Sequence, residues 1–84
     1  MSTVVMERVY SDGRSDTQID EMNGKIGPCL EINGVKHLST MVSKDRTRFI
    51  CSFEAPDAQT VKRAIESSGV AFERIYAVDV FTSG

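Results

Sequence analysis

Apolar and polar residues follow one another along the chain in a pattern that predicts four strands and two helices. Short runs rich in β-branched and aromatic residues are typical of strands, whereas apolar residues three and four positions apart are typical of a helix. On this basis we expect strands at residues 4–10, 35–43, 48–54 and 74–81. Helices are expected to begin near Ser15 and near Pro56.

The first helix has a clear start and a weak second half. Ser15 and Gln18 have the spacing of a capping box, in which each side chain bonds a free backbone N–H at the helix start. Apolar residues then recur at helical spacing, at Ile19, Met22 and Ile26. Three poor helix formers predict a kink or early fraying beyond that point: Gly24, Gly27 and Pro28.

The dipeptide Asn33-Gly34 supports two interpretations. It is the strongest short signal for a β-hairpin turn, and it also suits the end of a helix. We favour the helix end, because this leaves a cleaner strand over residues 35–43. A short polar connection then joins that strand to residues 48–54 in an antiparallel hairpin.

A second helix is expected between Pro56 and Gly69. Pro56 and Asp57 suit a first turn, and Gly69 suits a helix end. The order of elements is then β-α-β-β-α-β, that of ferredoxin-like α+β folds. Right-handed crossovers place both helices on one face of a four-stranded antiparallel sheet. Eighty-four residues leave room for one such domain, spanning 1–84.

The other face of this sheet would be uncovered, and a sheet face in water normally carries polar residues. The first and last strands instead carry apolar residues on both faces: Val4, Met6 and Tyr10 against Val5 and Val9, and Tyr76, Val78 and Val80 against Ile75, Ala77 and Phe81. The three residues after Phe81 are too few to cover the surplus. We therefore expect a homodimer that forms through the open sheet face.

Composition excludes several classes of partner. The formal charge of −2 comes from interspersed acids and bases, and tryptophan is absent, so we expect no nucleic acid partner. No apolar run is long enough to span a bilayer, which predicts no membrane partner and a cytoplasmic location. Two cysteines, Cys29 and Cys51, do not form a CxxC motif. We favour free thiols, with a single bridge between them as the alternative.

Short motifs are spread over nearly the whole chain: Met6-Glu7-Arg8, Gly34-Val35, the run Phe49-Ile50-Cys51-Ser52-Phe53-Glu54-Ala55-Pro56-Asp57-Ala58, Ser68-Gly69-Val70 and Arg74-Ile75. With these motifs the sequence resembles a small ferredoxin-like family, mostly of unknown function, that includes a nickel-binding bacterial protein. The resemblance implies a dimeric protein and allows nickel or another divalent transition metal as a cofactor.

One segment departs from the family pattern. Members carry Trp-x-His-Ser-Tyr where this chain has His37-Leu38-Ser39-Thr40-Met41, so the family histidine falls on Ser39. His37 and Ser39 are expected on the same side of a strand, because side chains alternate. His37 would then replace the missing histidine from two positions away. The alternative is a surface or interface histidine with no ligand.

Glu7 interrupts an apolar strand, so it must face water, pair with a cation or bind a ligand. We take Glu7 and His37 as candidate metal ligands. Glu7, Ser39 and Glu54 are the candidate ligand-binding residues, with an exposed strand end as the alternative for Glu54. Cys51 alternates with Phe49 and Phe53, and we expect it to pack under the helices as a small apolar residue, with a metal ligand or nucleophile as the alternative.

No motif specifies catalysis, which leaves two hypotheses from different classes. The first is a homodimeric binding protein that holds a transition metal or a small ligand near the sheet interface. The second, by fold analogy alone, is a small α/β-barrel enzyme of the monooxygenase or isomerase kind, with Glu7 or His37 as general base. A structural or regulatory dimer without a ligand is a third alternative.

Overall fold

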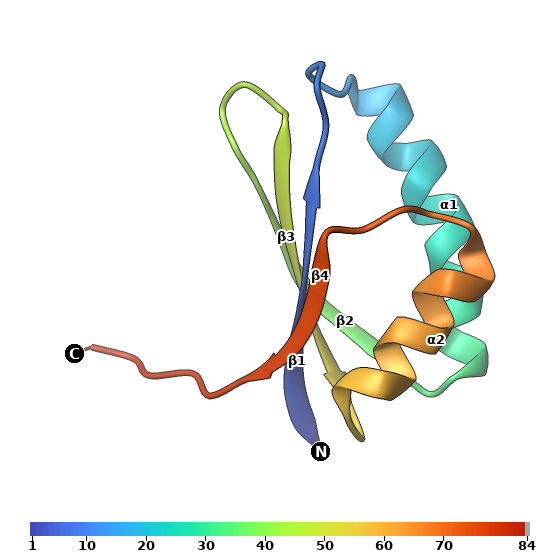
Figure 1. Cartoon of the computed structure of the whole chain (residues 1–84), viewed down its shortest axis with the longest axis vertical. Helices are drawn as coiled ribbons and strands as arrows, with labels where there is room; N and C mark the ends of the chain where they lie inside the picture. The colour runs from blue at the N-terminus through green and yellow to red at the C-terminus, as the bar shows by residue number, and fades with distance from the viewer. Residues whose placement is uncertain (84) are drawn as a thin grey trace.

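The computed structural model describes residues 1–83. Six elements follow in the order β1 (Ser2–Val9), α1 (Asp16–Ile32), β2 (Lys36–Val42), β3 (Arg48–Ala55), α2 (Ala58–Ser68) and β4 (Arg74–Val78). The strands form one antiparallel sheet in the order β2-β3-β1-β4, and both helices lie on one face of it (Figure 1). This arrangement confirms the ferredoxin-like α+β fold.

The start of α1 is the predicted capping box. The Ser15 Oγ accepts a hydrogen bond from the backbone N–H of Gln18 at 3.2 Å, and the Gln18 Oε1 accepts one from the N–H of Ser15 at 2.9 Å. The expected early fraying is wrong, because α1 continues through Pro28 to Ile32. Its second half is anchored to the core by the buried side chains of Ile26 and Leu30.

The end of α1 confirms the helix-cap interpretation of Asn33-Gly34. Gly34 adopts a φ of 68°, and its N–H donates to the carbonyl of Glu31 at 3.1 Å. The N–H of Val35 donates to the carbonyl of Leu30 at 2.9 Å. Together these two bonds form a Schellman motif, which satisfies carbonyls that the helix itself leaves free. After this motif Val35 is buried in the core, and β2 begins at Lys36.

The second helix is bounded as its sequence predicts. The Asp57 carboxylate accepts a hydrogen bond from the N–H of Thr60 at 2.7 Å, and Gly69 ends the helix in the left-handed conformation. β4 stops at Val78 and does not reach Phe81. Val78 pairs with Thr3 near the start of β1, so little partner strand remains beyond it.

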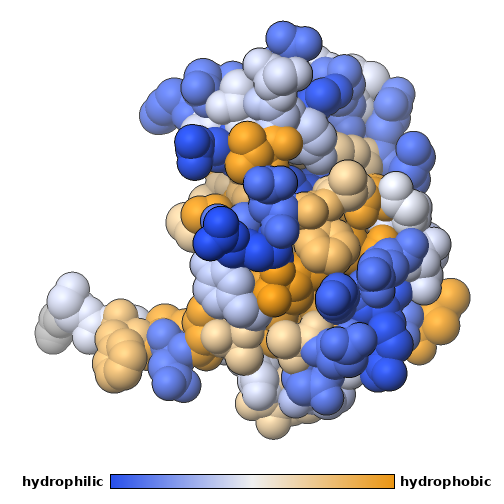
Figure 2. Space-filling model, in the orientation of Figure 1, coloured by the Kyte–Doolittle hydropathy of each residue, from blue (hydrophilic) through white to orange (hydrophobic). Residues whose placement is uncertain are grey.

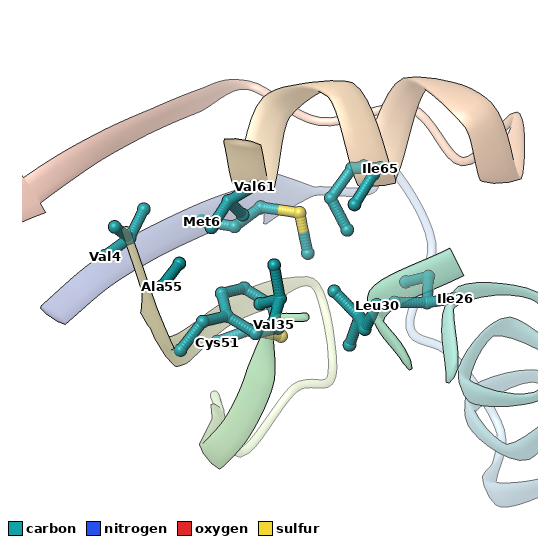
Figure 3. Close-up of a cluster of buried hydrophobic side chains, with 11 residues drawn as sticks. Val4, Met6, Ile26, Leu30, Val35, Cys51, Ala55, Val61 and Ile65 are labelled. Carbon is teal, nitrogen blue, oxygen red and sulfur yellow. The ribbon is translucent and has the colours of Figure 1, made fainter. Parts of the chain in front are cut away.

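The core fills the space between the sheet and the helices (Figure 3). Alternate residues of β1 and β3 point into it and meet apolar residues from both helices. The fully buried members include Val4, Met6, Phe53, Val61 and Ile65. Both cysteines are free thiols: Cys51 is buried in the core and Cys29 is half-buried.

The face of the sheet opposite the helices is left open by the described residues (Figure 1). By the strand register it carries the side chains of Val5, Glu7, Val9, Met41, Ile50, Ser52 and Tyr76. Residues 79–83 leave β4 on this side and run away from the sheet, with Phe81 92% exposed (Figures 1 and 2). None of the helices in residues 1–83 is long and apolar enough to cross a membrane.

Candidate functional site: a cavity beneath helix α1

A β-bulge in β2 decides which side of the sheet His37 faces. His37 pairs with Phe53 and Ser39 pairs with Ser52, so Leu38 is an extra residue with no partner on β3. Phe53 points under the helices and Ser52 points to the open face. The expectation that His37 and Ser39 share a side is therefore wrong, because the bulge breaks the period of two. His37 lies on the helix side and Ser39 on the open side.

On the helix side, His37 joins a line of polar groups that we call the polar chain: His37, Thr40, Cys51 and Arg8. His37 Nε2 lies 2.8 Å from Thr40 Oγ1 and 3.0 Å from the carbonyl of Ser39. Thr40 Oγ1 donates to Cys51 Sγ at 3.4 Å, and Arg8 Nη2 donates to the same sulfur at 3.9 Å. The imidazole and the thiol thus meet through one hydroxyl, which puts His37 and Cys51 on the same face.

Arg8, like Thr40, is a member of the polar chain that sequence reasoning missed. It is 2% exposed and is the buried charged residue of the described chain. Its guanidinium packs against the ring of Phe49, with 5.1 Å between the Cζ atom and the ring centroid. The signal was present in the sequence, because Val4, Met6 and Arg8 share one strand face by alternation. Because Val4 and Met6 are core residues, Arg8 on the same face must either be buried or interrupt the strand.

Two members of the polar chain, His37 and Cys51, line a cavity of about 180 Å³ between α1 and the sheet. Its floor is apolar and buried, and its rim holds exposed side chains. The floor consists of Met6, Ile26, Leu30, Cys51 and Phe53, and the rim of Asn23, Gly27 and His37. The His37 ring also packs on Phe53, with 5.4 Å between the ring centroids. The arrangement is an apolar pocket with a few convergent polar groups, which is typical of small-molecule sites.

The other candidate residues lie on the open face, outside this cavity. Glu7 accepts a hydrogen bond from the Tyr76 hydroxyl, which raises the pKa of Tyr76 above its ordinary value of 10.0. The hydroxyls of Ser39 and Ser52 lie 2.7 Å apart. Glu54 is exposed, and it pairs with Lys36 across β2 and β3. Of the two general bases considered, only His37 lines the cavity.

Comparison with known proteins supports the resemblance noted in the sequence. Residues 5–78 match the family model described as SCO4226-like, nickel responsive protein. The structure resembles the crystal structure of SCO4226 from Streptomyces coelicolor A3(2) with a TM-score of 0.84. The alignment covers 96% of this chain and 100% of that one at 16% sequence identity, so it shows the fold alone. Among curated proteins, none matches the sequence.

The name of the family raises the question of whether these residues fit nickel. His37 and Cys51 offer an imidazole and a thiol on one side of the sheet, and both are ligand types for nickel. Glu7 lies on the other side, so the two candidate metal ligands Glu7 and His37 do not meet within one chain. In residues 1–83 no three side chains of His, Cys, Asp or Glu form a group that could hold a metal ion. The ligand set in a single chain is therefore not a nickel site by itself.

Proposed function

The chain belongs to the SCO4226-like family of nickel responsive proteins, and we propose that it is a homodimeric binding protein with one small-ligand site per chain. The site is the cavity beneath α1, and the dimer forms through the open face of the sheet. The observation that carries the proposal is the cavity itself, because it combines an apolar floor with the imidazole, amide and thiol groups of His37, Asn23 and Cys51. The two free cysteines suit a reducing compartment such as the cytoplasm.

The size of the cavity indicates the size of the ligand. An apolar cavity of about 150 Å³ holds one benzene molecule. The 180 Å³ beneath α1 therefore suits a molecule built on one ring or a short branched chain. Larger ligands would require α1 to move away from the sheet.

Two features support pairing through the open face. The first is exposed apolar area at the sheet, where Val9, Met41 and Tyr76 are 49%, 61% and 41% exposed. The second is the C-terminal segment, which carries Val80 and Phe81 out beyond the same face (Figure 1). A second copy would cover both the face and the segment. Stable pairs of this kind bury about 1,200–2,000 Å² in total.

The dimer is tested by light scattering coupled to size-exclusion chromatography. We expect the wild-type chain to elute at twice its mass of 9.3 kDa. Ile50→Lys places a charge on the open face and should produce a monomer. Ile32→Lys is the matched control, because Ile32 is 84% exposed at the end of α1 and away from that face. A wild-type chain that elutes at the monomer mass would refute the dimer.

The cavity is tested with benzamide, a neutral probe of the right size, in a titration followed by ¹H–¹⁵N NMR. Shifts are expected at the rim residues Asn23, Gly27 and His37. Gly27→Val should abolish them, because a Cβ at Gly27 meets no atom within 4 Å and the added side chain can occupy the cavity. Gly24→Val is the matched control, since Gly24 has the same open surroundings one turn earlier and does not line the cavity.

Nickel binding is a second candidate function, favoured by the family and by the shared contact of His37 and Cys51 with Thr40. Because one chain lacks a full ligand set, the ion would need further ligands from a second copy or from water. Calorimetric titration of the reduced protein with NiCl₂ tests this. Loss of binding in His37→Ala with retention in Glu7→Gln would assign the ion to the helix side, and the reverse result would assign it to the open face. No binding by the wild-type chain would eliminate the candidate.

A further inference from the structure

We propose that the cavity beneath α1 selects small organic anions, specifically carboxylates with one ring or a short branched chain, through the charge of Arg8. The inference rests on the proposed function, because it names the class of ligand for the same cavity. Arg8 is a buried cation that forms no salt bridge within residues 1–83.

The surroundings of the Arg8 guanidinium are unusual for a buried charge. Its Nη1 atom donates to Met22 Sδ at 3.2 Å and its Nη2 atom to Cys51 Sγ at 3.9 Å. Its Nε atom has no hydrogen-bond partner in the described structure. Sulfur is a weak acceptor, so these contacts replace little of the hydration that the guanidinium loses on burial. A guanidinium in such a place is normally bonded to a carboxylate.

No carboxylate of the described residues fills that role. Within residues 1–83 the one salt bridge joins Arg46 to Asp16 on the surface. The acidic residues of β1 and β3, Glu7 and Glu54, point to the open face of the sheet. No acidic side chain lines the cavity either. The helix side of the sheet therefore holds the buried Arg8 guanidinium without a bonded carboxylate, and Arg14 places a second guanidinium on the Tyr10 ring that Arg8 also contacts.

Cys51 connects this charge to the cavity. Its sulfur accepts the hydrogen bond from Arg8 and is also part of the cavity floor. Arg8 itself does not line the cavity, so a negative group bound against Cys51 would interact with the guanidinium across that sulfur. The surroundings have a low dielectric constant, in which charges interact strongly even without direct contact. The apolar floor would hold the remainder of the molecule, and Asn23 and His37 would meet it at the rim.

The test compares three probes of nearly equal size: benzoate, benzamide and benzylamine, which are anionic, neutral and cationic at pH 7.5. Dissociation constants are measured by ¹H–¹⁵N NMR titration of the wild-type chain. We expect benzoate to bind about tenfold more tightly than benzamide, and benzylamine more weakly than both, as one charge-assisted contact predicts. This comparison needs no variant, so it holds even if a substitution at Arg8 prevents folding.

Arg8→Met then identifies the source of the preference, because methionine fills similar space without charge. The ratio of benzamide to benzoate dissociation constants should fall to about one in this variant. Arg48→Met, on the open face, should leave the ratio unchanged. Equal binding of benzoate and benzamide by the wild-type chain would overturn the inference and leave the proposed function standing. Failure of both probes to shift the rim residues would overturn the cavity as a site altogether.

Discussion

Tyr76 and Glu7 are joined across β4 and β1 by a hydrogen bond on the open face, in which the phenol donates and the carboxylate accepts. The two residues are diagonal neighbours, because Tyr76 pairs with Val5 and Glu7 pairs with Arg74. The bond explains how an acid is accommodated in an apolar strand. Glu7 thus has a neutral hydrogen-bond donor on the open face, where its direct partner on β4 is Arg74.

This pair predicts a dependence of stability on alkaline pH. The hydrogen bond from Tyr76 to Glu7 favours the neutral phenol and raises the pKa of Tyr76 above 10.0. The stabilisation is complete below pH 10.0 and is lost as the pH rises through the raised value, when the phenolate can no longer donate. Titration of the Tyr76 ring by NMR should show the raised pKa, and Glu7→Ala should return it towards 10.0. An unchanged pKa in Glu7→Ala would contradict the assigned cause.

The turn between β2 and β3 predicts a dependence on acid pH. Asp45 Oδ1 accepts hydrogen bonds from the hydroxyls of Ser43 and Thr47, and these bonds lower the pKa of Asp45 from 3.8 to about 2. The stabilisation is present above pH 3.8 and is lost as the pH falls through about 2. Asp45→Asn should therefore destabilise the chain at pH 6 and have little effect at pH 2, measured by urea unfolding. Asp12→Asn is the control, and an equal effect of the two variants would refute the assignment.

Two isoleucines of the helices should differ greatly in their contribution to stability. Ile65 of α2 is fully buried in the core, whereas Ile32 of α1 is 84% exposed. Ile65→Ala should reduce the free energy of unfolding by roughly 2–5 kcal/mol, because it leaves a cavity in the core. Ile32→Ala removes the same atoms from the surface and should change it by less than about 0.5 kcal/mol. Chemical denaturation monitored by circular dichroism measures both values.

Two glycines should respond in opposite directions to alanine. Gly34 has a φ of 68°, which strains any residue with a Cβ, so Gly34→Ala should destabilise the chain by about 1–2 kcal/mol. Gly24 lies inside α1 with no atom within 4 Å of an added Cβ, so Gly24→Ala should stabilise it by about 0.5–1 kcal/mol. Thermal unfolding would show one melting temperature fall and the other rise. Shifts of the same sign would contradict the assigned conformations.

Local signals were sufficient to predict most of the fold. The capping box of Ser15 and Gln18 and the cap at Asn33-Gly34 depend on short-range hydrogen bonds, and both occur where the sequence places them. The length of α1 could not be derived in this way, because it depends on tertiary contacts of Ile26 and Leu30 that outweigh the cost of Pro28. Propensity alone underestimates a helix that is held by its core.

The candidate site was harder to predict than the fold. Placing His37 required knowledge of the bulge at Leu38, and a bulge has no reliable sequence signal. The contact of Cys51 with Arg8 joins residues from two strands, so it appears only once their register is known. The position of Cys51 under the helices was predicted by alternation alone and is confirmed.

The bulge in β2 allows residues of this strand to change the side of the sheet that they face as related sequences diverge. Insertion or deletion of one residue at Leu38 reverses the facing of every residue that precedes it in β2, while β3 and the rest of the sheet keep their register. A histidine in this strand can therefore change from the open face to the helix side of the sheet without being substituted. Aligned positions in this strand need not be equivalent positions in space, and an inherited ligand must be assigned by the face it occupies.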